Sequence, residues 1–410
     1  MAGTTCAVAG GGPAGMVLGL LLARAGVEVV VLEKHADFLR DFRGDTVHAS
    51  TLRLLDELGL GEQFRALPQS RLQNVELPQP DGSRLTLGDF ARLPSPYNHV
   101  AMVPQWDLLN LLAEAARAEP SFTLRMRTAA VDLLRDGDRV VGVRTRTADG
   151  FEDELHTDLV VACDGRGSVL RAAAGLRPRS YPVPFDTWWF RLPRTEQEQR
   201  EPAALVPTLA GREMLLSFPR PDYFQVAYFA EKGHDARLRA EGIERFRERV
   251  GRLRPGFADR VDTLTSIDAL HHLDVRLDRL VRWHRPGLLL IGDAAHAMSP
   301  AGGVGINLAV QDAVAAAALL AGPLIEGRLS EADLARVQRR RWWPTVLVQH
   351  AQRVLHRLIF RPALAGRTPP VFRVAAAVAR RLPVLTVVPA RFIAFGPRPE
   401  HAPAFARRPG

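Results

Sequence analysis

The chain has 410 residues, of which 47% are hydrophobic and 24% charged, as in a globular protein with room for roughly two or three domains. Its two cysteines, Cys6 and Cys163, lie in predicted buried strands, which favours packed thiols over a disulfide and leaves too few ligands for a metal centre. No apolar run reaches the roughly 18 residues of a membrane-spanning helix, so we expect a cytoplasmic protein that is not integral to a membrane.

A short apolar strand, a glycine turn and a small-residue helix open the chain. The strand covers residues 4–9, the helix ends near Ala25, and a second strand over residues 28–32 ends in Glu33. This order of elements is the fingerprint of a dinucleotide-binding fold. The carboxylate accepts hydrogen bonds from an adenosine ribose and repels a 2′-phosphate, so the pattern predicts FAD or NAD here and not NADP. The predicted cofactor-binding residues are Gly10, Gly12, Pro13, Ala14, Gly15, Glu33 and Lys34.

The next segment predicts a loop, a helix and a hairpin. The loop holds Arg43 and His48, and leucines at helical spacing then indicate an amphipathic helix that ends at Gly59. Alternating stretches over residues 71–77 and 83–87 flank an Asp-Gly turn. They predict a hairpin in a sheet outside the nucleotide fold.

A helix and several strands lead to a second strand end. Residues 106–118 predict a helix preceded by Gln105, and residues 122–157 predict antiparallel strands with Asp-Gly turns. The buried strand over residues 158–163 ends in Asp164-Gly165.

An aromatic region between residues 177 and 274 predicts a second, largely antiparallel sheet. Trp188, Phe190 and Tyr228 are candidates to line an aromatic pocket in it. The alternative is that these side chains are ordinary sheet core.

The stretch from Leu288 to Asp312 is the third strand end. Four apolar residues stop at Gly292-Asp293, and a glycine loop then feeds an alanine-rich helix. A helix N-terminus carries unpaired N–H groups and about half a positive charge, so it suits a phosphate or a ring that becomes anionic. The alternative is a strand, a loop and a helix that only packs.

Two further motifs accompany the first fingerprint. Asp164, Gly165, Ser168 and Arg171 fit the pattern D-G-x-x-S-x-x-R, and residues 292–307 fit G-D-A-A-H-x-x-P-P-x-G-G-x-G-x-N except at one position. Over roughly residues 3–320 the combination resembles the single-component FAD-dependent aromatic hydroxylases, the flavoprotein monooxygenases of the p-hydroxybenzoate hydroxylase type.

The resemblance implies contacts with FAD. Asp293 would hold the ribityl chain, and the start of the following helix would lie at the pyrimidine edge of the flavin, where reduction adds negative charge. The loop and helix residues in question are Gly303, Gly305, Ile306 and Asn307.

Other cofactor contacts are implied in the same way. The Asp164-Gly165 motif serves both FAD and the pyridine nucleotide in that family. Arg43 and Gln105 match positions that contact FAD in relatives, with a surface ion pair and a helix cap as the alternatives.

Three further residues are assigned to the substrate side. Ser299 stands where the family usually has the first of two prolines beside the substrate ring, and Pro300 is the second. His48 lies in a loop that runs near the flavin in relatives, where a histidine is suited to deprotonating a phenol. A hydrogen-bonded structural histidine is the alternative.

The fold expected is α/β, with a Rossmann-type FAD-binding domain interleaved with a largely antiparallel β-sheet substrate domain, plus C-terminal helices. The FAD-binding domain takes residues 1–70, 101–178 and 275–330; the substrate domain takes 71–100 and 179–274; a helical cap takes 331–410.

The chemistry implied by the resemblance is reduction of FAD by NADH or NADPH, addition of O2 to give a flavin hydroperoxide, and hydroxylation of an aromatic or other electron-rich small molecule. The enzyme would be a monomer or homodimer. Two alternatives remain open: a FAD-dependent reductase or dehydrogenase that does not use O2, and a non-catalytic interaction protein that keeps FAD.

The net charge of +9 is unevenly distributed. From Arg328 onward there are 16 arginines against 3 acids, which makes this tail +13 and the preceding body −4. No nucleic-acid fold signature accompanies the arginines, and prolines break the helices of the tail. We therefore expect a solvated helical cap, with no nucleic-acid partner and no membrane anchor.

Overall fold

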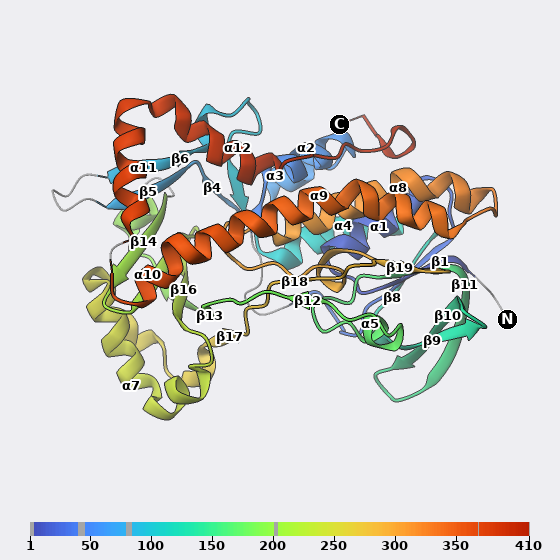
Figure 1. Ribbon diagram of the computed structural model, residues 1–410, viewed down its shortest axis with the longest axis horizontal. Coiled ribbons are helices and arrows are strands. Elements are labelled where there is room, and N and C mark those ends of the chain that lie inside the picture. Colours follow the sequence, from blue (N-terminus) through green and yellow to red (C-terminus); the bar gives the residue numbers. More distant parts are fainter. Residues whose placement is uncertain (1–3, 40–45, 79–83, 201–203, 368, 410) are drawn as a thin grey trace.

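The computed structural model describes residues 4–39, 46–78, 84–200, 204–367 and 369–409. Two sheets lie toward opposite ends of an elongated molecule, and the helix α9 (Glu331–Leu355) runs lengthwise past both of them (Figure 1). Both sheets and helices are present as predicted, and the α/β class is confirmed.

The first sheet has a parallel centre. Its strand order is β19-β20-β11-β1-β2-β8, with β1 parallel to both β11 and β2, β11 parallel to β20, and β2 parallel to β8. Runs such as VVVL in β2 are buried on both faces, as parallel strands require. The hairpin of β9 and β10 extends the sheet from the first half of β11. The strands are β1 Thr4–Ala9, β2 Val29–Leu32, β8 Phe122–Arg125, β9 Thr128–Asp136, β10 Arg139–Thr147, β11 Glu152–Ala162, β19 His284–Arg285 and β20 Leu288–Leu290.

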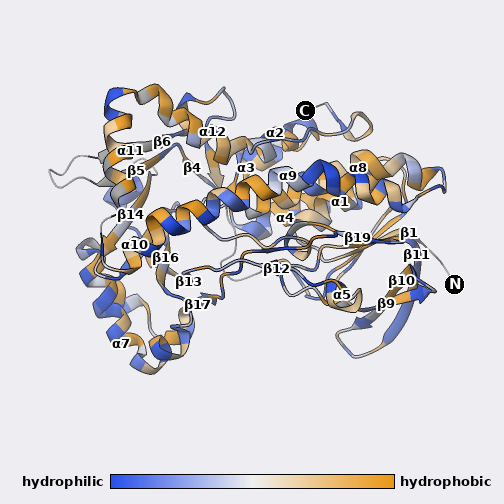
Figure 2. Cartoon of the chain, in the orientation of Figure 1, coloured by the Kyte–Doolittle hydropathy of each residue, from blue (hydrophilic) through white to orange (hydrophobic). Residues whose placement is uncertain are grey.

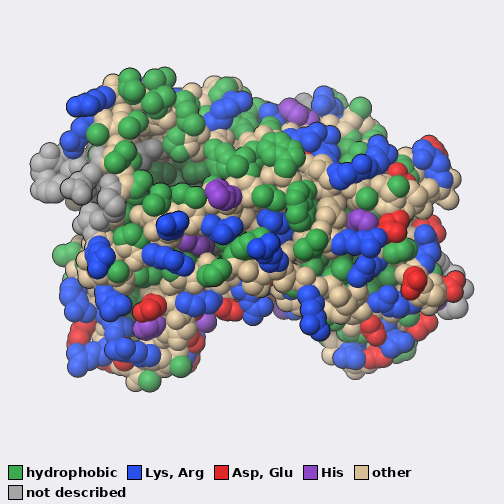
Figure 3. Space-filling model, in the orientation of Figure 1, with side chains coloured by type: hydrophobic (Ala, Val, Ile, Leu, Met, Phe, Trp, Pro, Cys, Tyr) green, Lys and Arg blue, Asp and Glu red, His purple; other side chains and the backbone are tan. Residues whose placement is uncertain are grey.

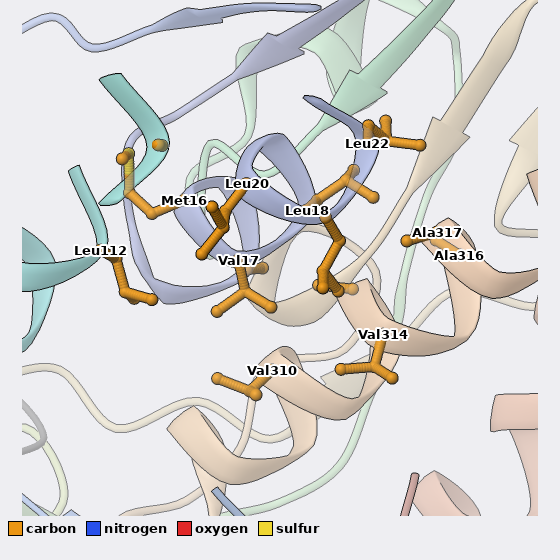
Figure 4. Close-up of a cluster of buried hydrophobic side chains, with 14 of the residues drawn as sticks. Met16, Val17, Leu18, Leu20, Leu22, Leu112, Val310, Val314, Ala316 and Ala317 are labelled. Carbon is orange, nitrogen blue, oxygen red and sulfur yellow. The ribbon is translucent and has the colours of Figure 1, made fainter. Parts of the chain in front are cut away.

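Three helices cover one face of this sheet: α1 (Pro13–Arg24), α4 (Gln105–Arg117) and α8 (Gly305–Ile325). Figure 4 shows apolar side chains of α1, such as Val17, directed at Val310 and Val314 of α8 and near Leu112 of α4. α1 packs closely on the sheet because Gly19 has no side chain; a Cβ there would lie 2.7 Å from Val31. This core holds α1 and α8 in fixed relation to the strand ends.

α8 is also the one helix of the described residues that is long and apolar enough to cross a membrane, with a mean hydropathy of 1.8. The expectation that no segment is long and apolar enough to span a membrane was therefore wrong, because α8 meets both criteria. The fold explains the composition differently, because 78% of that window is buried among other elements.

The second sheet is largely antiparallel, as predicted. Its order is β17-β13-β16-β15-β14-β5-β6, in which β14 and β5 form the parallel pair. The predicted hairpin is β5 and β6, and it joins this sheet and not the nucleotide fold. Helix α7 (Asp235–Leu253) packs on one face. The strands are β5 Asn74–Pro78, β6 Arg84–Asp89, β13 Phe185–Pro193, β14 Ala204–Ala210, β15 Glu213–Pro219, β16 Tyr223–Glu231 and β17 His271–Leu273.

Smaller elements join the two sheets. A three-stranded sheet pairs β7 with both β3 and β4, and β12 pairs with β18. The elements are β3 Thr46–Val47, β4 Ser70–Leu72, β7 Val100–Met102, β12 Arg179–Ser180, β18 Asp278–Arg279, α2 Ala49–Glu57, α3 Gly61–Ala66, α5 Val169–Ala173 and α6 Glu196–Arg200.

The C-terminal segment is helical, as predicted. A π-helical turn over His356–Phe360 follows α9, and then come α10 (Arg361–Leu364), α11 (Pro370–Arg381) and α12 (Val387–Phe395). The last residues return to the first sheet's helices, where Arg24 donates a hydrogen bond to the Ala406 carbonyl. The C-terminal residues therefore contact α1, the first helix of the chain.

Candidate active site

Four strand ends meet at one edge of the first sheet. Gly10 follows β1, Glu33 follows β2, Asp164 follows β11, and Gly292 lies just beyond β20. The four strands are parallel neighbours in the sheet, so their carboxyl ends share an edge. The three sequence motifs, which lie far apart along the chain, are thereby brought together.

The first glycine loop has an open space in front of α1. Gly10 has a φ of +109°, and a Cβ on it would lie 2.5 Å from the Cys163 carbonyl oxygen. A Cβ on Gly15 would overlap the Gly10 carbonyl oxygen at 1.9 Å. A Cβ on Gly12, in contrast, would meet nothing within 4 Å. α1 begins at Pro13 without a side-chain cap, so its N–H groups face this space and suit a pyrophosphate.

Glu33 is held at the same loop. One carboxylate oxygen accepts from the Gly11 N–H and the other from the His35 N–H, both at 3.0 Å. The side chain is buried, while Lys34 beside it is exposed. The carboxylate is thus fixed next to the glycine turn, where ribose hydroxyls would donate to it.

Arg171 ties the middle motif to the late motif. Its guanidinium donates to the Ala294 carbonyl at 3.0 Å and to the Arg166 carbonyl at 2.6 Å. Ser168 caps α5 by accepting from the Arg171 N–H at 3.0 Å. Arg166 in turn lies 3.6 Å from the carboxylate of Asp293, which is partly exposed at the end of β20. Arg171 therefore links the middle motif to the residue after Asp293, and Arg166 forms an ion pair with Asp293 itself.

Asp164 is largely buried and only half satisfied. Its Oδ2 accepts from the Leu170 N–H at 3.2 Å, whereas Oδ1 has no hydrogen-bond partner within the described part of the chain. Burial raises the pKa of the Asp164 carboxyl, and hydrogen bonds from Ser168 and nearby backbone partly oppose that shift. A free acceptor beside Gly165 is available to a ligand hydroxyl or amide.

The start of α8 presents unused donors. Val304 precedes the helix without a side-chain cap, and no acidic side chain lies in the first turn, which begins with the half-buried Gly305 and Ile306. Asn307 is buried, and its Oδ1 accepts from the hydroxyls of Ser50 at 2.5 Å and Thr51 at 2.9 Å. Its Nδ2 has no partner among the described residues. An orphaned donor beside an uncapped helix end indicates a site for negative charge.

These features fit FAD. The open space at Gly12 suits the pyrophosphate, Glu33 the adenosine ribose, and the α8 end an electron-rich ring edge that gains charge on reduction. The described residues contain no group of three or more His, Cys, Asp or Glu side chains placed to hold a metal. Cys6 is a buried free thiol and Cys163 a half-buried one, so the two form no disulfide.

His48 is engaged on both ring nitrogens. Nδ1 lies 2.8 Å from the Ile393 carbonyl and Nε2 lies 2.9 Å from the Gly303 carbonyl. Burial lowers the pKa of His48, and the two backbone contacts oppose that shift. The Thr46 hydroxyl also donates to the Gly303 carbonyl, at 3.0 Å. A neutral imidazole donates from only one nitrogen, so the ring donates a hydrogen bond to one of these two carbonyls and packs the glycine loop against α12. Its role as a base toward substrate stays a prediction.

Ser299 faces α9 and not an open pocket. The side chain is buried, its Oγ lies 2.9 Å from Nε2 of His356, and its backbone N–H donates to Gln352. Pro300 is half-buried and its carbonyl accepts from the Gly303 N–H, which closes the turn of the loop. A serine at the first position of the pair is explained by this polar contact with the C-terminal helices.

The three aromatic candidates lie on the wrong face of the second sheet for a pocket at the glycine loop. Trp188, Phe190 and Tyr228 are buried in the core between the sheet and α7, and Trp188 donates to Asp235 at 2.8 Å. Adjacent strand residues point to opposite faces of the sheet, so a shift of one residue in the assignment replaces a pocket-facing side chain by a core side chain. The pocket interpretation of these three residues is contradicted by this packing.

The opposite face meets the glycine loop. Trp189, Phe218 and Phe229 belong to the apolar cluster that includes Ala301 of that loop. Trp189 and Phe218 are half-buried, and their rings are 5.8 Å apart. The sequence indicates an aromatic strand through the pair Trp188-Trp189. It does not show which of the two tryptophans faces the glycine loop, because adjacent strand residues point to opposite faces.

Gln105 is the first residue of α4 and is half-buried. α4 has no side-chain cap, so the helix-cap alternative is not what this residue does. Arg43 lies outside the described residues.

A buried ionic network lies behind the site, and the sequence motifs do not indicate it. Asp312 in α8 accepts from Arg341 at 2.9 Å, from His296 at 2.6 Å and from the Gly292 N–H at 3.1 Å. Arg341 also contacts Glu400 at 3.2 Å. Burial raises the pKa of Asp312, but His296 and Arg341 outweigh it, and the pKa is lowered overall. The available signal was a single acid in the otherwise uncharged sequence of α8.

A nucleotide edge with an orphaned acceptor, an uncapped helix end and a facing apolar sheet defines a flavin-dependent oxidoreductase built on a dinucleotide-binding fold. The chain belongs to the FAD binding domain family, whose model matches residues 3–349. The family confirms the predicted cofactor.

Three similar proteins are named as monooxygenases. The chain is 39% identical over 345 residues to 6-methylpretetramide 4-monooxygenase of Streptomyces rimosus, covering 82% of this chain and 80% of that protein. It is 28% identical to rifampicin monooxygenase of Streptomyces venezuelae, covering 75% of this chain and 61% of that longer protein. The structure of p-nitrophenol 4-monooxygenase PnpA from Pseudomonas putida DLL-E4 shares the fold, with a TM-score of 0.77, 22% identity, and coverage of 97% and 99% of the two chains. The predicted class, an FAD-dependent monooxygenase of aromatic or other electron-rich small molecules, is confirmed.

Proposed function

We propose that this enzyme hydroxylates an electron-rich aromatic ring of a polycyclic, polyketide-type small molecule. The name of the relative with 39% identity, 6-methylpretetramide 4-monooxygenase, supports this substrate class. The observation that carries it is the apolar sheet face with half-buried Trp189 and Phe218, which belongs to the same cluster as Ala301 of the glycine loop. A face of this kind offers stacking area to fused rings.

The balanced reaction is ring C–H plus O2, NAD(P)H and H⁺ to ring C–OH, water and NAD(P)⁺. Bound FAD supplies the redox chemistry, taking electrons from NADH or NADPH and passing them to O2. The residues of this chain bind FAD, orient the substrate and exclude water from the ring edge. We assign the pyrophosphate to Gly12 and α1, the ribityl chain to Asp293, and stabilisation of developing negative charge to the N-terminus of α8 and Asn307.

Substrate binding is assigned to the wall formed by the second sheet. Its apolar face and the loop at Pro300 exclude water from the ring edge, which favours transfer of oxygen to substrate over loss of reducing equivalents. His48 and Thr46 hold that loop through the Gly303 carbonyl. We propose that the enzyme works in the cytoplasm as a monomer or homodimer, with the domain division given in the sequence analysis.

The test uses the purified holoenzyme. Polycyclic phenols and the single-ring p-nitrophenol are compared for their ability to accelerate NADH- or NADPH-driven reduction of the bound flavin. An active compound is then turned over under isotopically labelled O2, and one labelled oxygen is expected in the product. Product without label would identify a reductase, and acceleration by p-nitrophenol alone would reject the polycyclic substrate class.

A further inference from the structure

The C-terminal helices contain a long stretch without acids. Between Leu334 and Pro399 there are 13 arginines and neither an aspartate nor a glutamate. Two of these arginines, Arg340 and Arg341, are paired with Glu400. Others, including Arg357 and Arg381, are exposed. The surface of this segment is therefore strongly cationic.

The same segment exposes most of the large apolar side chains on the surface. Of the 17 exposed large hydrophobic residues described, 11 fall between Leu334 and Pro399, which is far more than its share of the chain. We call the set the basic apolar face. Its apolar members are Trp343, Leu347, Val354, Leu355, Leu358, Val374, Val378, Leu382, Val384, Leu385 and Val388.

Two groups of elements build the face. Trp343, Leu347, Val354 and Leu358 follow one side of α9 and its π-helical continuation, at spacings of three to four residues or their sum. The other group lies on α11, α12 and the turn between them, where Val374 is 64% exposed and Val388 is 61% exposed. Figure 2 shows hydrophobic and hydrophilic residues alternating along the visible side of α9.

Both groups appear on one side of the molecule. Figure 3 shows apolar side chains over α9 and over α11 and α12, with arginines among them, while the acidic side chains in that view gather over other elements. The expected break at Pro344 is wrong, because this proline lies inside the continuous helix α9; Pro370 and Pro383 do begin separate helical segments. The fold instead places exposed apolar residues of several shorter helices on a common side.

The charge pattern selects among occupants of this face. A second copy docked symmetrically on the same face would bring two acid-free arginine sets together, which is unfavourable. A nucleic acid would pair with arginines but leave exposed valines and leucines without partners, and Trp343 is the one aromatic side chain among the named members of the face that could stack on bases. Arginines meet lipid phosphates while short aliphatic side chains enter the headgroup and acyl boundary, so an anionic bilayer satisfies both features.

We propose that the basic apolar face docks the enzyme reversibly on an anionic phospholipid surface, without insertion of a spanning helix. α8, the one described helix that is both long and apolar enough to span, is held inside the fold. No member of the face belongs to the strand-end edge with Gly12 and Glu33, so docking uses residues other than those assigned to FAD. This proposal does not depend on the identity of the substrate.

The experiment is sedimentation of the full-length holoenzyme with vesicles of phosphatidylcholine containing about one quarter phosphatidylglycerol, at about 0.15 M salt. Binding is expected, with little binding to pure phosphatidylcholine. The variant Val374→Ser/Val384→Ser/Val388→Ser should lower the partition coefficient by about tenfold or more, because it removes apolar area that enters the boundary. The variant Arg357→Gln/Arg381→Gln should lower it and weaken its dependence on salt.

The matched control is Phe151→Ser/Val281→Ser, which removes exposed apolar side chains from elsewhere on the surface and should bind as the parent does. Retained FAD and an unchanged melting temperature verify the fold of each variant. The proposal is overturned if the parent does not bind the anionic vesicles, or if the triple valine variant binds them equally. It is also overturned if the parent forms a dimer that the valine variant abolishes, or prefers duplex DNA over vesicles regardless of that variant.

Discussion

Arg341 of α9 donates from Nε to Oδ1 of Asp312 in α8 at 2.9 Å, and both side chains are at most 1% exposed. Through the other carboxylate oxygen, Asp312 fixes the Gly292 N–H directly before Asp293. Arg341 also reaches Gln311, whose amide donates to Ser50, the residue that donates to Asn307. One guanidinium outside the nucleotide sheet thus supports both the Gly292–Asp293 strand end and the Asn307 helix end of the candidate flavin site.

The first prediction concerns this arginine. Arg341→Ala leaves the buried Asp312 carboxylate without its guanidinium partner, and breaking such a pair typically costs about 3 to 5 kcal/mol. We expect a loss of that order in the free energy of unfolding, measured by urea titration, together with weaker FAD binding. Arg339→Ala, an exposed arginine of the same helix, is the control and should change little. Equal stability of the two variants would show that the network does not support the fold.

The second prediction separates cofactor loss from misfolding. Gly12→Val places a side chain in the open space before α1, so the apoprotein should fold with near-normal stability and fail to retain FAD. Gly15→Val would collide with the Gly10 carbonyl, so it should prevent folding itself. Circular dichroism and flavin absorbance of the purified variants distinguish the outcomes. A yellow Gly12→Val protein with ordinary FAD affinity would remove the pyrophosphate from this loop.

The third prediction uses two adjacent tryptophans. Trp189→Ala should leave the melting temperature nearly unchanged and raise the substrate concentration needed to accelerate flavin reduction, because its half-buried ring lies on the face toward the glycine loop. Trp188→Ala removes a fully buried ring and should cost about 3 to 5 kcal/mol of stability. If the two variants exchange these behaviours, the face assigned to substrate is the wrong one.

The fourth prediction concerns acid. Burial, with help from the charge of Arg361, lowers the pKa of His356 to about 4, below its ordinary value of 6.5. Between these values the unfolded chain binds a proton that the folded chain does not, so stability is complete above pH 6.5 and falls as the pH drops toward 4.

This histidine should contribute on the order of 1 kcal/mol per pH unit in that window. His356→Gln is therefore expected to flatten the decline in unfolding free energy measured between about pH 7 and about pH 5. His350→Gln, at an exposed position of α9, provides the comparison and should keep the decline. A parallel decline in both variants would assign the acid sensitivity to other groups.

The nucleotide edge could be predicted because each part has a local cause. Gly10 and Gly15 must be glycines because backbone atoms of Cys163 and of Gly10 lie where their Cβ atoms would be. Glu33 is placed at the glycine turn because it directly follows β2. The order of strands then follows from parallel pairing. These constraints act within short segments, so the sequence displays them.

The substrate wall and the ionic network could not be predicted for a different reason. Whether Trp188 or Trp189 faces the glycine loop depends on how a whole sheet is set against the first one, and two adjacent aromatic residues fit either parity. Arg341 meets Asp312 because α9 packs against α8, which is a matter of long-range packing. The environment of His48 likewise includes a carbonyl of α12, 345 residues away.

The Asp312 network also determines when, during synthesis of the chain, the support behind the candidate flavin site can form. The carboxylate emerges 29 residues before Arg341, and Arg341 emerges 59 residues before Glu400. The strands of the nucleotide sheet precede all three residues in the chain, so they leave the ribosome while the supporting charges are still unmatched. Asp312 gains its guanidinium partner once Arg341 has emerged, but the full network forms only after Glu400. A product that stops just short of Glu400 would carry all the flavin motifs with Arg341 lacking its second carboxylate partner.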